Sequence, residues 1–482
     1  LSGEYGFFGF NLDMPTHSKE TQIPSIEDIY KIEETDLEIA GYFVNTSLTL
    51  EQKFDEKGNH KLETSLIYSN WDGEINSGLN DLPTDALWQK TGNNYRNRTI
   101  QNDYQDDYRL KVDYTLPLSE KSTLETGLQT RFLLADSKFR GEDFSDLNQD
   151  WVVDNALNNG FDFHRNIYSA YASISGTVLG MSAKIGLRGE YTDRLLQTID
   201  NDKYALDRVD IIPSVHLSKK LSGEREIQAS YTRKINRPEE WNLNPNPIIT
   251  TEYVKQSGNP DLLPELTDSY ELNFMQRMKK GFVSVEGYYR QTNDAIDRTI
   301  NYNESEDITE IGIANLNRNF AYGAEIASNL NLAKWFSVYA SVNIYGTKIK
   351  GELVSEGVET ESVGSDFVLN SNFTFLKATR LQVTSFYNSP RLTAQGQRSE
   401  MYGVNLALNR SFFNRKFDVS VRARDVLNTM KFKFKANSPG SKTDFTFDMD
   451  SPSFMVSVGY RINNYKKRKE TEGLEIGGGG VM

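Results

Sequence analysis

The feature that most constrains this chain is an alternation of apolar and polar side chains that recurs from one end to the other. Residues 336–345 place Phe, Val, Ala, Val and Ile on one face and Ser, Tyr, Ser, Asn and Tyr on the other. The pattern returns at residues 181–191, 417–424 and 454–462. A period of two predicts β-strands with one apolar and one wet face. The runs reach roughly 10 to 18 residues, whereas strands of soluble sandwiches are usually about 5 to 6 residues long.

The connections between these runs are of two kinds, and the two kinds alternate. Short links lie near residues 118, 178, 219, 278, 331, 375 and 412. Long polar segments lie near 14–39, 72–103, 139–160, 198–206, 237–264, 299–310, 351–362 and 431–444. Tight periplasmic turns and long extracellular loops are typical of outer-membrane barrels. The sequence therefore predicts an all-β fold, a transmembrane antiparallel up-and-down β-barrel.

The same rule gives the organisation of the chain. It predicts roughly eighteen strands, the first near 3–12 and the last near 446–463. An even number places both ends of the barrel on the short-turn side. No Pro/Gly/Ser-rich linker divides the chain, so we expect one barrel over residues 1–463 and a flexible periplasmic tail over 464–482.

Composition narrows the function classes. No stretch approaches the roughly 18 consecutive apolar residues of a spanning helix. The net charge of −13 argues against nucleic-acid binding, which depends on basic clusters. The absence of cysteine removes thiolate metal sites and Cys nucleophiles.

Catalytic and metal-binding motifs are weak throughout. Asp146, Asn148 and Asp150 have the spacing of a calcium loop, but Trp151 and Leu157 stand where the turn glycine and the bidentate acid belong. The four histidines are scattered, and no nucleophile elbow, Walker loop or dinucleotide fingerprint is present. We therefore expect no metal, no cofactor and no enzyme activity.

Residues 231–247 and 258–274 carry a more specific signal. The first segment ends a strand in Arg and Pro, and the second reads GNPDLLPELTDSYELNF. With this spacing the chain resembles the barrels of TonB-dependent outer-membrane receptors, and most closely the outer-membrane β-barrel family abundant in Bacteroidetes. The matching motif residues, taken as structural, include Arg237, Pro238, Asn259, Pro260, Pro264, Glu265, Tyr270 and Glu271.

The resemblance implies a Gram-negative outer membrane, whose lipid surrounds the barrel, and large extracellular loops that capture ligands or partners. Receptors of this class have a plug domain and 22 strands, but residues 1–40 do not resemble a plug. Either upstream strands and a plug belong to a longer receptor, or this is a plugless relative.

Two functions follow from these alternatives. The first is uptake of a bulky nutrient (siderophore, oligosaccharide or peptide), driven by the TonB energy-coupling complex through a plug outside this chain. Surface lipoproteins are further expected partners. The second is a non-transporting barrel that serves as a structural or accessory subunit of an outer-membrane secretion or assembly complex. A soluble β-propeller enzyme would need repeats of about 40 residues, which are not seen.

Aromatic residues suggest where the lipid and the ligand lie. Interfacial girdles of a barrel are rich in Tyr and Trp, and those near strand ends are assigned to such girdles: Tyr68, Trp71, Trp335, Tyr339, Tyr387 and Tyr460. In the loop 237–264, Trp241 and Tyr253 are candidates for contacts with a ligand or partner. The alternative is that they fold the loop onto itself.

Overall fold

A computed structural model describes residues 1–22, 27–250, 254–303, 305–306, 308–353, 356–376, 378–414, 416–438, 441–448 and 451–461. The tail predicted at 464–482 lies outside these residues. Within them the chain forms one β-sheet of 24 strands and one short 3-10 helix. No helix among the described residues is long and apolar enough to cross a membrane.

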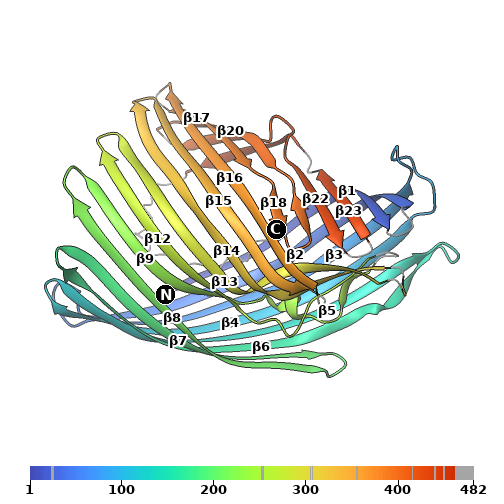
Figure 1. The fold of residues 1–482 in the computed structure, drawn as a ribbon, viewed down its shortest axis with the longest axis horizontal. Coiled ribbons are helices and arrows are strands. Elements are labelled where there is room, and N and C mark those ends of the chain that lie inside the picture. Colours follow the sequence, from blue (N-terminus) through green and yellow to red (C-terminus); the bar gives the residue numbers. More distant parts are fainter. Residues whose placement is uncertain are drawn as a thin grey trace.

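Eighteen of the strands form a barrel wall in which sequential strands pair antiparallel (Figure 1). They are β1 (Ser2–Gln22), β2 (Glu27–Lys53), β3 (Lys61–Thr84), β4 (Tyr95–Ser119), β5 (Ser122–Ser145), β6 (Asp150–Val178), β7 (Met181–Thr198), β8 (Lys203–Leu221), β9 (Arg225–Asn236), β12 (Glu265–Met278), β13 (Gly281–Asn303), β14 (Ile308–Ala333), β15 (Phe336–Leu353), β16 (Glu356–Phe375), β17 (Thr379–Asn388), β20 (Met401–Phe412), β21 (Phe417–Arg424) and β24 (Ser453–Tyr460).

The remaining elements lie in the long connections. They are the hairpins β10 (Pro247–Thr250) with β11 (Val254–Ser257), β18 (Arg391–Thr393) with β19 (Gly396–Arg398), and β22 (Lys431–Ser438) with β23 (Ser441–Asp448), and the 3-10 helix η1 (Glu240–Leu243). The hairpin β10–β11 and η1 belong to the connection between β9 and β12. This connection, residues 237–264, is called the inner loop below.

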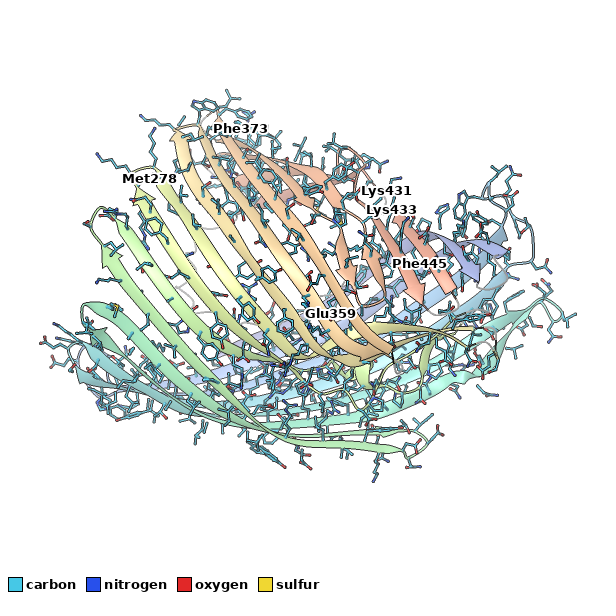
Figure 2. All side chains as sticks on the ribbon, in the orientation of Figure 1. Met278, Glu359, Phe373, Lys431, Lys433 and Phe445 are labelled. Atoms are coloured by element: carbon cyan, nitrogen blue, oxygen red, sulfur yellow. The ribbon has the colours of Figure 1, made fainter. Side chains whose placement is uncertain are left out.

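The two ends of the barrel differ as the sequence predicts. Short turns join strands at one end: Leu179 and Gly180, both at positive φ, close the turn between β6 and β7. Met278 and Phe373 lie near such turns in Figure 2, and Glu359 lies at the opposite end of the wall. A membrane strand needs only about 10 residues, so the strands extend far beyond the lipid on the extracellular side.

This extension corrects the sequence interpretation of most of the long loops, since strands also cover most of 14–39, 299–310 and 351–362. The sequence pattern predicts polar loops at 72–103 and 139–160, yet β3 continues to Thr84 and β5 to Ser145. Outside the bilayer both faces of a strand meet water, so the alternation fades while the backbone pairing continues.

The pleat separates a lipid face from a lumen. Tyr231, Tyr270, Tyr289 and Tyr322 are direct register partners across β9, β12, β13 and β14. The rings of Tyr231 and Tyr270 lie 4.9 Å apart on the outer surface, where Leu272 and Phe274 follow them towards the periplasmic end. Ser269, on the opposite face, is buried. Alternate residues of β12 therefore face the lipid and the lumen, as a period of two predicts.

The last strand differs from its prediction. Instead of one strand near 446–463, β23 and β24 are separate segments, and β23 pairs with β1 from Thr16 to Gln22 at the extracellular end. Nearer the periplasm, Ser2–Asp13 of β1 pairs with β2, and β24 pairs with β21. Among the described residues, β1 therefore meets the hairpin strand β23 at the extracellular rim, while the last wall strand, β24, pairs with β21 and not with β1.

Candidate functional site in the barrel lumen

The inner loop folds into the lumen instead of standing out from the barrel. Leu243 and Leu262 of this loop are 0% exposed. They join a hydrophobic cluster with residues of β5, β6 and β7, namely Leu133, Phe139, Phe161, Phe163 and Leu196. Because the lumen-facing side of these strands is apolar at this level, burial of the two leucines stabilises the folded-in loop.

Backbone carbonyls of the inner loop are held by buried arginines of the wall. The Arg194 guanidinium donates to Leu262 O at 2.9 Å and to Pro260 O at 2.8 Å. Arg165 donates to Pro238 O at 3.2 Å. Charged donors make the stronger class of hydrogen bond. These contacts fix both ends of the loop against β6 and β7.

The other side of the inner loop is attached to β14. Asn259 donates to Ile313 O at 3.1 Å, and its side-chain oxygen accepts from Asp261 N. Asn315 donates to Leu263 O and accepts from Leu263 N. The backbone of Gly258 lies against the backbone of Asn242, so a Cβ at position 258 would clash with Asn242 O. The GNPDLLPE segment is therefore a structural element that positions the loop.

The other motif residues flank this arrangement. Arg237 forms an ion pair with Glu190 and donates to Thr192. Glu265 accepts from Ile296 N at 2.7 Å. Tyr270 belongs to the outer tyrosine row, and Glu271 pairs with Arg290 at 3.1 Å in the lumen. Neighbouring motif residues therefore face different environments, the lipid for Tyr270 and the lumen for Glu271, as a period of two predicts.

A cavity of 510 Å³ opens between the inner loop and the inner faces of β2 to β6. Its apolar lining comes from both sides. The wall gives Leu37, Trp71, Ile75, Leu79, Phe139 and Phe161, and η1 gives Trp241. This volume lies within the range of roughly 300 to 1,000 Å³ of small-ligand pockets.

Several polar side chains of the cavity are held in place by hydrogen bonds to neighbouring side chains. Asp103 accepts hydrogen bonds from Ser137 and from Gln101. It lies on β4 beyond the membrane-spanning part, and burial raises the pKa of its carboxyl group. Trp241 donates from its indole nitrogen to Glu239 at 2.6 Å, which fixes the ring at the cavity wall.

A second group of charges lies at the extracellular rim. The ammonium of Lys31 is 3.7 Å from Asp81, and both side chains are buried. Glu33 faces Asp81 across the β2–β3 register. The pKa of Glu33 is raised to about 7, mainly by burial and then by repulsion from Asp81. Attraction to Lys31 acts in the opposite direction and lowers this pKa.

The predicted contact residues have different outcomes. Trp241 lies at the cavity but is 46% exposed, so its role in ligand contact stays a prediction. Tyr253 lies outside the described residues. The assignment of Trp71 to a lipid girdle is wrong: its ring lines the cavity and stacks on Phe8, 6.5 Å away. Trp71 is three residues from Tyr68, so the two rings point to opposite faces.

Among the described residues, no three or more His, Asp or Glu side chains are grouped so that they could hold a metal ion. Asp146, of the calcium-like sequence, instead pairs with Arg96 at 3.1 Å.

The lipid-facing tyrosine row, the apolar outer wall and the polar lumen define an outer-membrane β-barrel. The model of the outer membrane protein beta-barrel family matches residues 52–460. The chain belongs to this family, and its location is the outer membrane. A comparison with curated proteins gives no match.

Solved structures with the same fold include several transporters. The chain is similar to the copper transporter OprC, with 11% identity over 91% of this chain and 80% of that one and a TM-score of 0.51. It is also similar to the ferric citrate transporter FecA, with 9% identity over 93% and 78% and a TM-score of 0.50. The FrpB iron transporter from Neisseria meningitidis shows 10% identity over 91% and 83%, also with a TM-score of 0.50. These likenesses show the fold alone.

Proposed function

We propose that this chain is the barrel of a transporter that imports a bulky nutrient across the outer membrane. The observation that carries the proposal is the inner loop, which docks inside the lumen against β5, β6, β7 and β14 and borders a cavity. A ligand that binds there could pass only if the loop or the structure below it moves. In this role the barrel moves its ligand across the membrane and does not convert it chemically.

The lower lumen supports an energised mechanism. A second cavity of 630 Å³ is lined by polar and charged side chains, among them Lys184, His216, Gln228, Glu271 and Glu286. A barrel lumen with such a polar lining would pass water and small solutes unless it were filled, and a plug that fills it needs energy to be displaced. We therefore propose coupling to the TonB complex through such a plug.

A reversible lock on the inner loop tests the proposal. Lys255 of β11 and Glu310 of β14 are register partners, and the chain has no cysteine of its own. In the full-length protein, Lys255→Cys with Glu310→Cys would join the loop to the wall after oxidation. We expect uptake by the native host to fall under oxidising conditions and to recover with dithiothreitol.

The matched control is Leu195→Cys with Ala205→Cys, register partners within the wall on β7 and β8. This pair should leave uptake unchanged because the wall strands do not move. Uptake of ferric citrate, maltotriose and trialanine would be compared with that of a deletion strain. If deletion and locking change none of them, while the protein copurifies stoichiometrically with other outer-membrane subunits, the accessory-subunit function replaces transport.

A further inference from the structure

The side chains around the 510 Å³ cavity restrict the chemistry of its ligand. None of its described lining residues is Lys or Arg. An anionic ligand such as a ferric carboxylate complex would enter a desolvated site without a counter-charge, which is costly. The lining therefore disfavours the anionic class of nutrient.

The acidic residues of the cavity are already engaged. Asp103 accepts from Ser137 and Gln101. Asp136 pairs with Lys138 at 3.2 Å, and Glu240 interacts electrostatically with Arg165. Asp136 and Glu240 therefore have a cationic neighbour, and both oxygens of Asp103 are occupied by neutral donors, so a cationic peptide finds few free carboxylate oxygens.

Most polar groups of the cavity are neutral and can both donate and accept. They are Thr35, Ser77, Asn97, Thr99, Gln101, Gln105 and Ser137. Hydroxyl and amide side chains of this kind match ligand hydroxyl groups, which also donate and accept. Asn97, Thr99, Gln101 and Ser137 already donate to other side chains. Thr35, Ser77 and Gln105, with the remaining acceptor capacity of the other four, fit a polyhydroxylated ligand.

Two indoles complete the site. Trp71 comes from the wall, where Gly73 leaves room for its ring: a Cβ there would lie 2.9 Å from the indole. Trp241 comes from the inner loop and is fixed by Glu239. Indole rings offer flat apolar surfaces, which suit the C–H faces of sugar rings.

We propose that the cavity between the inner loop and β2 to β6 binds a neutral oligosaccharide, with Trp241 covering one sugar face. This inference rests on the proposed function and selects one of its nutrient classes. The bound ligand then contacts the inner loop directly, because Trp241 belongs to the segment that must move before the ligand can pass.

Isothermal titration of the purified protein tests the assignment, in a detergent without a sugar headgroup. The probes are maltotriose, xylotriose and chitotriose, with ferric citrate and trilysine as the anionic and cationic alternatives. We expect at least one trisaccharide to bind. Trp241→Ala should weaken it about tenfold, equivalent to about 1.4 kcal/mol, and Trp241→Phe should restore most of the affinity.

Trp335→Ala is the matched control, since Trp335 is 58% exposed beside a periplasmic turn. It should bind like the wild type. Failure of all three trisaccharides overturns the assignment, as does Trp241-dependent binding of trilysine or ferric citrate. In either case a loop lock that still stops uptake would leave the transport function standing.

Discussion

Replacing Leu262 by Ala should release the inner loop from the lumen without unfolding the barrel. Leu262 is fully buried and packs in the cluster formed by β5, β6 and β7. Its contacts are lost when the loop moves out, whereas the wall keeps its backbone pairing. A buried Leu→Ala substitution costs about 2 to 5 kcal/mol. The loss should appear as a change in the equilibrium between the docked and undocked loop.

Hydrogen exchange followed by mass spectrometry measures this equilibrium. The amide of Leu263 donates to Asn315 of β14 at 2.8 Å and loses this partner when the loop undocks. The amides of Gly258 and Asn259 donate to Asn244 O and Asn242 O within the loop itself. At about 1.4 kcal/mol per tenfold change, exchange of peptides covering residues 258–264 should accelerate about 30-fold to several thousand-fold, up to the limit set by the free peptide.

Leu147→Ala is the control, because Leu147 is 98% exposed in the turn between β5 and β6. It should change exchange by less than about twofold, as expected of a surface substitution. Unchanged exchange at 258–264 in Leu262→Ala would refute the docking energy assigned to this leucine. Faster exchange spread evenly over β5 to β9 would instead show that the loop supports the whole barrel.

Two further predictions concern the lipid face and the extracellular rim. Leu272→Arg puts a charge on the lipid face and should lower the free energy of unfolding in vesicles by about 2 to 4 kcal/mol. The neighbouring substitution Asn273→Arg puts the charge in the lumen and should change this free energy far less. Equal effects of the two substitutions would contradict the assigned orientation of β12. Glu33 has a folded pKa raised to about 7 from the ordinary 4.5 of a glutamate. Its contribution to stability is therefore present below about pH 4.5 and is lost as the pH rises through 7. Amide hydrogen exchange at residues 28–35, corrected for the pH dependence of the intrinsic exchange rate, should slow as the pH falls from 8 to 5. Glu33→Gln should make this corrected rate less dependent on pH. If the variant keeps the pH profile of the wild type, Glu33 is not the source of the pH dependence. The charged groups around Glu33 are Glu20, Lys31 and Asp81.

Some elements of this protein follow from the sequence alone. A period of two needs only the pleat, so periodicity by itself assigns the lipid and lumen faces of the strand from Ser269 to Phe274. Short and long connections in alternation indicate the two ends of the barrel. The assignment of Trp71 to the lipid girdle is wrong because it relied on the closeness of this residue to an expected strand end. The alternation of side chains along the strand places Trp71 on the lumen face.

Other elements depend on contacts between distant segments, which a local pattern does not contain. Periodicity indicates a long loop at 237–264, but its docking needs Arg165 and Arg194 on one side and Asn315 on the other. The cavity likewise joins Trp71 and Trp241, which are far apart in the chain and meet only when the wall closes. The sequence determined the barrel because side-chain alternation is local, and the tertiary structure decided the site because the lumen brings together strands from across the chain.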